Sequence, residues 1–249
     1  MPSEQRDPAS TFTDPGVNVA YIGHASFMWT ASDGTRVLID PYQEPDDGPT
    51  WFEGDFPEVE ADLVASTHNH FDHNAVGMAV GSPALLTAPG EYETPGIRIT
   101  SVPEVHAGKW VMPNSLAVVE SGGVKFVHCG DNRFDVDPTV ASAVGEVDVV
   151  IVAVDDSLHL MSRAEVWRLA TTFSPRVIIP MHFLLPGVVT PSSTLLGIED
   201  WLGSLPEGTQ IRRIPEDEVT ASSEDMPPRS EVPQAPAIWV FGAARAAGL

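Results

Sequence analysis

Short runs of apolar residues, separated by polar and turn residues, dominate the sequence from residue 17 onward. Runs of this length that are rich in β-branched residues are typical of β-strands. The segment 17–41 predicts two strands joined at Ser32, Asp33 and Gly34, because this tripeptide is a hairpin signal between alternating apolar runs. Further strands are predicted at residues 61–68, 97–102, 115–120, 124–130, 147–154 and 176–183.

Residues 162–173 have apolar positions at helical spacing. Ser162 can cap this helix, and Glu165 stands three positions later, as in a capping box. The strand predicted at 176–183 follows at once. Strand pairs early in the chain, followed by alternating strands and helices, predict a mixed sheet system covered by helices.

The two ends of the sequence are different in kind from its middle. Residues 1–16 are expected to form a flexible N-terminal tail, and residues 17–215 a single folded domain. Residues 216–236 are rich in acidic residues, Pro and Ser, so this segment is expected to be flexible. The apolar stretch AIWVFG then follows within 216–249, and it either returns as an edge strand or docks on another subunit of a homo-oligomer.

Composition places the chain among ordinary globular proteins, since 43% of its 249 residues are hydrophobic. No apolar run approaches the roughly 18 to 20 residues of a membrane helix, and the first residues lack the pattern of a signal peptide. A cytoplasmic protein that does not bind membranes is therefore expected. The single cysteine, Cys129, cannot form an intrachain disulfide, and its apolar surroundings predict a buried thiol.

The balance of charge is strongly acidic, with 35 acidic and 13 basic residues and a net charge of −22. Such a surface repels phosphate backbones, because binding them depends on clustered Lys and Arg. A small-molecule substrate is therefore expected in preference to nucleic acid. An acidic proteome that favours solubility would also explain the charge without any link to function.

One short segment concentrates residues that bind metals. Residues 67–76 read THNHFDHNAV and hold three of the eight histidines of the chain. The strand at 61–68 would deliver this loop to a sheet edge, where functional sites are often built. Three later runs end in a His or Asp at the same kind of position, in SVPEVHAG, FVHCGDN and IIPMHF. Imidazole nitrogens and carboxylate oxygens are ligands for zinc, manganese or iron. The candidate metal ligands are therefore His68, His70, Asp72, His73, His106, Asp131 and His182.

The pattern His-X-His-X-Asp-His, with a later strand-end His, a Gly-Asp and a Pro-Met-His, resembles the metallo-β-lactamase fold hydrolases. This resemblance implies an α/β (α+β) fold, a four-layer αββα sandwich with a dinuclear site at one edge of two packed sheets. The motifs YIGHASF, VLIDP and APGEYETPGIRI are similar to the branch that includes the L-ascorbate-6-phosphate lactonase and uncharacterised zinc-dependent relatives. The likeness extends from residue 17 to about residue 188.

The resemblance implies two divalent metal ions, with zinc as the first choice and manganese or iron as alternatives. One ion would be held by His68, His70 and His106, the other by Asp72, His73 and His182, with Asp131 between them. Asp72 and Asp131 would also fix the geometry of catalysis. Each ion keeps an open position for a shared water, whose pKa falls from 15.7 to roughly 7 on binding, so that hydroxide is available as the nucleophile.

Two further residues match the branch. Asp40 in VLIDP corresponds to an aspartate that supports the His-rich loop without touching metal, and such partners orient ligand imidazoles. His24 in YIGHASF is expected to play a similar outer role, although a Gly-His turn between strands also has a structural explanation. His128 is interpreted as a core residue.

Contacts with the substrate are expected from residues close to these motifs. Trp51 stands in an aromatic loop that either lines a cleft or packs against the body of the domain, and His159 is a further cleft candidate. Lys109 follows His106 by three positions, and Arg133 follows Asp131 by two. Each either holds an anionic group of the substrate or offsets surface acids.

The sequence thus predicts a dinuclear metal-dependent hydrolase of a small ester, lactone or phosphorylated metabolite. Class B β-lactamases usually have cysteine where Asp131 stands, so antibiotic hydrolysis is not expected as the main role. A metal-dependent nuclease or phosphodiesterase is the first alternative, but it requires a basic groove, which the acidic composition disfavours. A non-catalytic metal-binding protein of the same fold is the second alternative.

Overall fold

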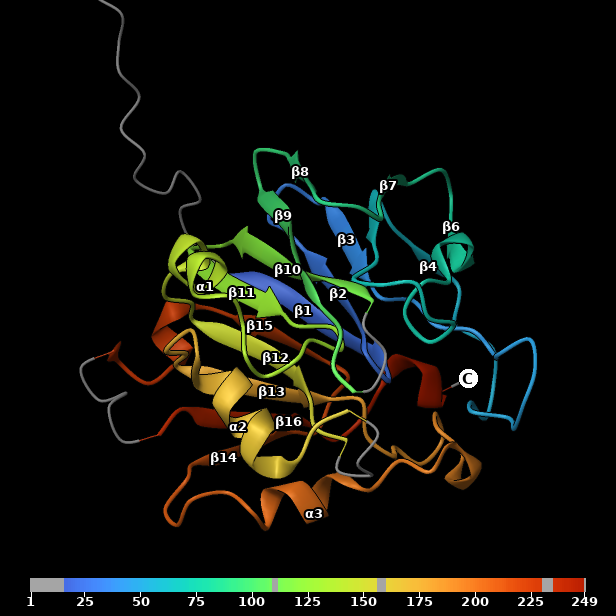
Figure 1. The fold of residues 1–249 in the computed structure, drawn as a ribbon. Coiled ribbons are helices and arrows are strands. Elements are labelled where there is room, and N and C mark those ends of the chain that lie inside the picture. Colours follow the sequence, from blue (N-terminus) through green and yellow to red (C-terminus); the bar gives the residue numbers. More distant parts are fainter. Residues whose placement is uncertain (1–15, 109–111, 156–159, 230–234, 249) are drawn as a thin grey trace, which may run out of the picture.

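Two packed β-sheets form the centre of the computed structural model, which describes residues 16–108, 112–155, 160–229 and 235–248 (Figure 1). Among these residues, one sheet has the order β15 (Glu218–Ala221), β1 (Val17–Gly23), β2 (Ser26–Thr30), β3 (Arg36–Ile39), β5 (Leu63–Ala65) and β7 (Ala84–Leu86). The larger sheet has the order β14 (Ile211–Ile214), β16 (Ala237–Phe241), β13 (Val177–Met181), β12 (Val149–Ala153), β11 (Val124–His128), β10 (Pro113–Ser121), β9 (Ile97–Val105) and β8 (Gly90–Glu93). The short strands β4 (Val59–Glu60) and β6 (Ala79–Val80) pair separately. This mixed α/β architecture confirms the predicted fold class.

The larger sheet changes from antiparallel to parallel pairing at β11. Strands β9, β10 and β11 are antiparallel neighbours, whereas β11, β12 and β13 run parallel, as do β13, β16 and β14. Every residue of β12 and β13 is buried, which explains why these strands are continuous apolar runs without alternation. As a result, β9, β11, β12 and β13 all end at the same edge of the sheet.

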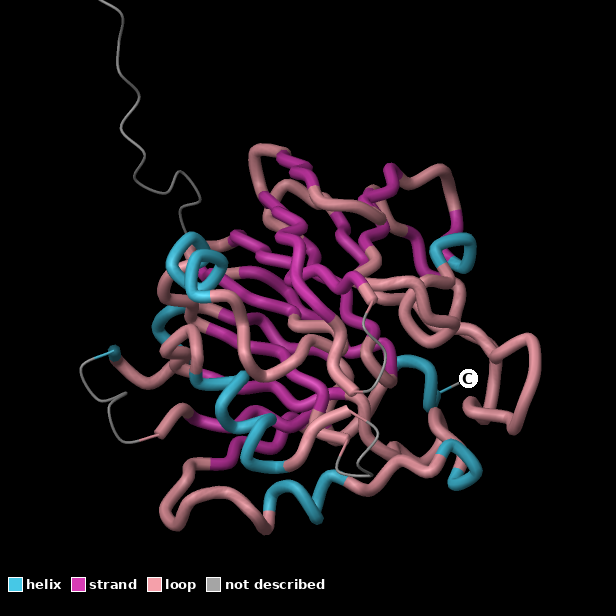
Figure 2. Tube along the Cα trace, viewed as in Figure 1, coloured by secondary structure: helices cyan, strands magenta, loops and turns pink. Residues whose placement is uncertain are grey.

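Helices are few in the described part of the chain. The α-helices are α1 (Pro138–Val144), α2 (Arg163–Thr171) and α3 (Ile198–Leu202), and the 3-10 turns are η1 (Val76–Met78), η2 (Pro191–Ser193), η3 (Ser223–Asp225) and η5 (Arg245–Gly248). Helices α1 and α2 lie over the outer face of the larger sheet (Figures 1 and 2). The predicted capping box of α2 is confirmed, because Ser162 N donates to Glu165 Oε2 at 2.8 Å. None of the helices described is long and apolar enough to cross a membrane.

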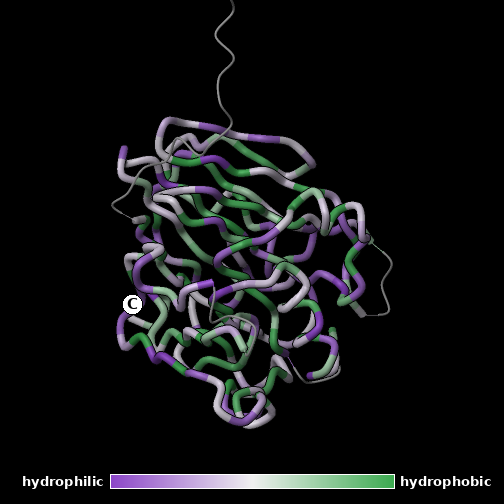
Figure 3. The backbone as a smooth tube through the Cα atoms, turned by 90° about the vertical axis from the view of Figure 1, so that its left-hand side faces the viewer, coloured by the Kyte–Doolittle hydropathy of each residue, from purple (hydrophilic) through white to green (hydrophobic). Residues whose placement is uncertain are grey.

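Aromatic side chains fill the space between the two sheets. The ring of Trp29 on β2 lies 5.8 Å from that of Phe126 on β11, and Phe27 lies 6.0 Å from Phe241 on β16. All four side chains are buried. The hydrophobic segments accordingly run through the middle of the molecule in Figure 3, while hydrophilic segments lie mostly in the outer loops. This core holds the two sheets together and fixes the strand ends that carry the site.

The segment 17–41 contains three strands, not the two that the sequence predicted. The chain reverses between β1 and β2, where Gly23 has a φ of +143° and His24 a φ of +55°. Tyr21 Oη stabilises this reversal by donating to the carbonyl of His24 at 3.0 Å. The second reversal, at Asp33 and Gly34, is the hairpin turn that was predicted.

The C-terminal segment contributes strands to both sheets. Strand β15 pairs with β1 in an antiparallel register, and β16 lies between β13 and β14 inside the larger sheet. The sequence had suggested flexibility for 216–236 and an edge position or a docked position for the last apolar stretch. Arg176 accounts for part of the difference, because its guanidinium donates to the carbonyls of Ser223, Met226 and Pro227.

Candidate metal centre

The seven predicted ligands come together at one edge of the two sheets. The His-rich loop follows β5, whereas the other ligands follow β9, β11 and β13 of the larger sheet. Two compact groups result, in each of which the potential ligand atoms lie within 4.8 Å of one another. The first group contains His68, His70, His106 and Asp131, and the second contains His24, Asp72, His73 and His182. The grouping matches the predicted division between two ions and adds His24 to the second group.

In the first group, the potential ligand atoms of different residues lie close enough together to face one common point. His68 Nε2 lies 3.1 Å from His70 Nδ1 and 3.9 Å from Asp131 Oδ2. His106 Nε2 lies 3.5 Å from the same oxygen. In the second group, Asp72 Oδ2 lies 3.4 Å from His182 Nε2 and 3.7 Å from His73 Nε2.

Asp131 lies between the two groups and reaches both. Its Oδ2 is 3.5 Å from His106 Nε2 in the first group and 3.7 Å from His182 Nε2 in the second, while its Oδ1 is 3.4 Å from His73 Nε2. The preceding Gly130 has a φ of +53°, and a Cβ at that position would lie 2.4 Å from Thr67 Oγ1. A glycine is therefore required for the loop to bring Asp131 against the His-rich segment.

Two observations indicate that these residues are suited to binding metal ions. Tetrahedral coordination with metal–nitrogen bonds of about 2.0 to 2.1 Å places neighbouring ligand atoms about 3.3 to 3.4 Å apart, which is close to the separations in both groups. Several of these atoms are also buried without a hydrogen-bond partner in the described part of the chain: His73 Nε2, His106 Nε2, His182 Nε2 and Asp131 Oδ1. Buried polar atoms are normally paired, so these atoms are suited to binding a cation.

Electrostatics favour ionised carboxylates in this site. Burial opposes ionisation of Asp131, but His182 and His73 hold its pKa well below the usual range. Asp72 behaves similarly, because His73, His182 and His24 outweigh its burial and lower its pKa. Burial, together with the proximity of His73, lowers the pKa of His68 to about 3, so this imidazole is neutral as a ligand must be.

His73 lies close to three buried carboxylates, those of Asp131, Asp72 and Asp40. Burial would lower its pKa, but Asp131, Asp72 and Asp40 raise it to about 10. Three buried carboxylates around one imidazole therefore attract positive charge strongly. Divalent cations at the two groups would supply that charge.

Asp40 supports the His-rich loop in the way that the sequence suggested. Its Oδ1 accepts from Thr67 N at 2.7 Å, and its Oδ2 accepts from Thr67 Oγ1 at 2.7 Å and from His73 Nδ1 at 2.8 Å. Since Nδ1 of His73 is engaged with Asp40, Nε2 faces Asp131 and the rest of the cluster. Asp40 itself has a φ of +52°, a strained conformation of the kind found at functional sites.

His24 lies directly against the second group. Its Nε2 is 3.0 Å from Asp72 Oδ2, and its ring centroid is 4.2 Å from that of His182. Burial first, and then the proximity of His182, lower the pKa of His24 to about 4. The neutral imidazole therefore donates to the Asp72 carboxylate. The backbone of the same residue forms the turn between β1 and β2 and accepts from His182 N at 3.0 Å, so His24 has both a structural contact and a site contact.

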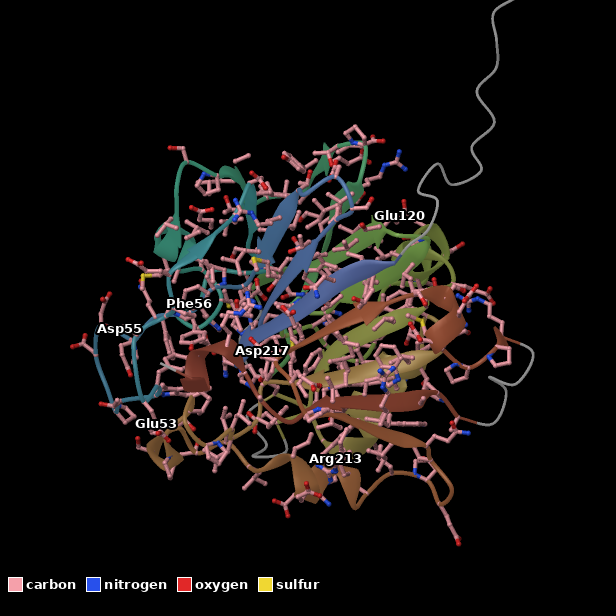
Figure 4. All side chains as sticks on the ribbon, turned by 180° about the vertical axis from the view of Figure 1, so that it is seen from behind. Glu53, Asp55, Phe56, Glu120, Arg213 and Asp217 are labelled. Carbon is pink, nitrogen blue, oxygen red and sulfur yellow. The ribbon has the colours of Figure 1, made fainter. Side chains whose placement is uncertain are left out.

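The remaining sequence candidates have different positions. Trp51 packs edge-on against His24 and Phe71, with ring centroids 6.3 and 5.3 Å apart. Its loop, which also carries Glu53, Asp55 and Phe56, extends beside the six-stranded sheet in the view from behind (Figure 4). His128 lies in the core and its Nε2 bonds the carbonyl of Ala25 at 2.8 Å.

Of the two basic residues predicted to contact the substrate, the structure describes one. Arg133 is partly exposed beside His106 and forms a bidentate pair with Asp135. Lys109 and His159 lie outside the described residues.

Sequence reasoning missed the role of Thr67 and the contacts that the aromatic loop makes with His24. Thr67 gives both its amide and its hydroxyl to Asp40, and its place directly before the His-rich motif was the available signal. Phe52 packs 5.4 Å from His24 and stacks on Tyr42 at 4.1 Å. These contacts join segments that are distant in sequence, so no local pattern could reveal them.

Comparisons with known proteins agree with this geometry. The sequence profile of the Beta-lactamase superfamily domain matches residues 18–182. A metal-dependent hydrolase of Thermococcus onnurineus is 29% identical over 195 residues, which cover 67% of this chain and 84% of that protein. A metal-dependent hydrolase of Rubrobacter xylanophilus is 25% identical over 209 residues, which cover 69% and 85%. A solved structure from Thermotoga maritima, named as a Zn-dependent hydrolase of the metallo-β-lactamase superfamily, superposes with a TM-score of 0.64 at 25% identity and covers 90% of this chain and 98% of that chain.

Proposed function

Because the chain belongs to the metallo-β-lactamase superfamily and is a metal-dependent hydrolase, we propose that it uses two divalent ions to hydrolyse a small ester, lactone or phosphorylated metabolite. The observation that carries this proposal is the position of Asp131, whose two oxygens lie 3.4 to 3.7 Å from ligand atoms of both groups. One carboxylate shared by two sets of imidazoles is the arrangement that offsets the repulsion between two neighbouring cations.

The proposed ligand assignment follows the two groups. One ion is assigned to His68, His70 and His106, the other to Asp72, His73 and His182, and Asp131 to both. Zinc is the proposed metal, because mixed imidazole and carboxylate ligands suit it and the Thermotoga maritima protein is named as Zn-dependent. Asp40 and His24 are proposed to act from outside, each through a hydrogen bond to one ligand.

The ions, when bound, would supply hydroxide from water at neutral pH and polarise the oxygen of the substrate. The residues of the chain hold this chemistry in place. Asp72 and Asp131 stay ionised because neighbouring histidines outweigh their burial, so both remain available as anionic ligands. Asp40 fixes the ring of His73 through Nδ1, and the ring of Trp51 packs perpendicular to that of His24.

A nuclease or phosphodiesterase acting on polymers is the weaker proposal. Arg133 is the described cation beside His106, and its guanidinium is already engaged by Asp135. A polyanionic strand would therefore approach a chain whose net charge is −22, which opposes its binding.

Two measurements test the proposal together. Elemental analysis after metal-replete purification should give close to two ions per chain, and a panel of lactones, carboxylic esters, phosphoesters and single-stranded RNA should show turnover of at least one small substrate. Loss of turnover in chelator and its recovery with zinc would link the two results. A metal content near zero, or turnover of RNA alone, would contradict the proposal.

A further inference from the structure

A cavity of about 270 Å³ lies beside His106. We infer that this cavity receives an uncharged apolar group of the substrate, so that the enzyme acts on neutral esters or lactones and disfavours substrates with an anion at that group. The inference rests on the proposed hydrolase function and adds the chemical class of the substrate. It also assigns Arg133 to the wall of the cavity, where it holds Asp135, and not to the binding of a phosphate.

The cavity adjoins the metal centre through a shared residue. Its walls come from the ends of β9 and β11 and from the start of α2, which lie at the same edge of the larger sheet as the ligands. His106 belongs both to this wall and to the first group. A substrate whose reacting carbon lies at the metals can therefore place a neighbouring substituent in the cavity.

The small size of the cavity and the apolar part of its lining favour an apolar substituent. Whole-ligand pockets usually measure roughly 300 to 1,000 Å³, so this smaller space suits one part of a small molecule. Among the described residues, Val105, Ala107, Phe134, Leu160 and Met161 form the apolar part of its lining, and His106, Arg133, Asp135 and Glu165 form the polar part. Burial of alkyl groups against such a lining is favourable.

The charged side chains that the structure describes in this cavity are bonded within the protein. Arg133 donates through Nε and Nη2 to the two oxygens of Asp135, and this bidentate bond lowers the pKa of the Asp135 carboxyl. Glu165 accepts from Ser162 N at 2.8 Å and from Ser162 Oγ at 2.7 Å as part of the capping box of α2. An anion entering the cavity would have to displace Asp135 from Arg133 and would face the carboxylate of Glu165. A cation would meet Arg133, and it would have to compete with Arg133 for Asp135 and with Ser162 for Glu165. Arg168, which lies 5.0 Å over the ring of Phe134, is a further positive charge nearby.

The test uses esters that differ only at one end of the acyl chain. The set is a hexanoyl ester, the same chain ending in a carboxylate, the same chain ending in an amine, and an acetyl ester. We expect kcat/KM for the hexanoyl ester to exceed the values for both charged chains at least about tenfold, or roughly 1.4 kcal/mol. A preference for either charged chain would overturn the inference, and a preference for the carboxylate that disappears in Arg133→Gln would restore an anchoring role for this arginine.

A substitution that fills the cavity tests whether the preference for the hexanoyl ester arises there. Val105→Phe should lower the ratio of kcat/KM for hexanoyl over acetyl esters at least about tenfold, with metal content measured alongside. The matched control is Val102→Phe, which places the same residue on the same strand but outside this cavity. Equal ratios in the two variants would contradict the assignment of the cavity.

A binding measurement distinguishes a failure of this inference from a failure of the proposed function. Calorimetry with hexanamide, adipic acid monoamide and 6-aminohexanamide requires no turnover. Preferential binding of hexanamide that is lost in Val105→Phe would support the cavity even if no ester is hydrolysed. If the acid or amine binds better, or if hexanamide binds Val105→Phe as well as the wild type, the inference is wrong whatever the enzyme hydrolyses.

Discussion

Asp40 and His73 are joined by a hydrogen bond of 2.8 Å between two fully buried side chains that are 33 positions apart in the sequence. The bond occupies Nδ1 of His73 and turns Nε2 toward Asp131, which lies 3.4 Å away. The orientation of one proposed ligand is therefore set by a residue that does not belong to either ligand group. Outer partners of this kind commonly change metal affinity 10- to 100-fold.

We expect Asp40→Asn to weaken metal binding about 10- to 100-fold without abolishing it, because His73 would remain present but would lose its fixed orientation. Competition with a chromophoric chelator measures this affinity. The control is Asp62→Asn, which changes an exposed carboxylate on the turn between β4 and β5. An unchanged affinity in Asp40→Asn would show that packing alone orients His73.

Asp131→Ala should remove metal and activity together. The carboxylate is proposed to serve both ions, and without it the two sets of imidazoles have no anion between them. Elemental analysis should fall below one ion per chain, and turnover should fall by at least about 10³-fold, or roughly 4 kcal/mol. Retention of two ions with activity lost would instead assign Asp131 to substrate chemistry alone.

His24→Ala should keep both ions and lose only part of the activity. The substitution removes a neutral donor to Asp72, whereas His73 and His182 still face that carboxylate. His24→Gln, which can donate a hydrogen bond from a side-chain amide, should recover part of kcat. Metal loss equal to that of Asp131→Ala would make His24 a ligand of the second group and would correct its proposed outer role.

Local patterns could predict the strands β9 to β13 of the larger sheet and the segments that carry the candidate ligands. The apolar runs that became β9 to β13 are each complete within a few residues, and the seven candidate ligands follow such runs directly. The capping box between Ser162 and Glu165 is likewise contained in four residues. Where a structural feature depends on a few neighbouring residues, the prediction from sequence agrees with the structure.

The features that sequence could not give depend on contacts between distant segments. The break between β1 and β2 falls at the Gly-His pair that the sequence suggested as a turn. The local pattern was too weak to divide the strand there, since the break depends on the positive φ of His24 and on the bond from Tyr21. Strand β15 is only four residues long, and its register is set by pairing Val17 with Ala221. The contact between His24 and Asp72 spans 48 positions. In each of these cases the tertiary contact supplies the information that the local sequence lacks.

The thiol of Cys129 should be inert in the folded protein. Its side chain is fully buried, and burial raises its pKa, so very little reactive thiolate exists near neutral pH. An aromatic disulfide reagent should titrate one thiol in urea but react at least about 100-fold more slowly with the native protein, since reaction requires local opening. Rapid native reaction would show that the strand end before Asp131 opens readily.

Arg176 should control the stability of the segment after β15. Its side chain is almost fully buried and donates to the carbonyls of Ser223 at 2.6 Å, Met226 at 3.0 Å and Pro227 at 2.6 Å. We expect Arg176→Ala to destabilise the protein by about 3 to 5 kcal/mol, because these carbonyls and the carboxylate of Asp148 would lose a buried charged partner. Urea unfolding measures the change in free energy.

Arg176→Lys should recover little of this loss, since an ammonium group cannot reproduce the planar fork that reaches three carbonyls. Arg213→Ala is the matched control, because it removes an exposed arginine whose pair with Glu199 contributes at most about 1 kcal/mol. Hydrogen exchange across residues 216–229 distinguishes the structure from the flexibility that the composition of this segment suggested. Slow exchange in the wild type that becomes fast in Arg176→Ala would show that the arginine holds an ordered segment. Fast exchange in both proteins would show that composition was the better guide.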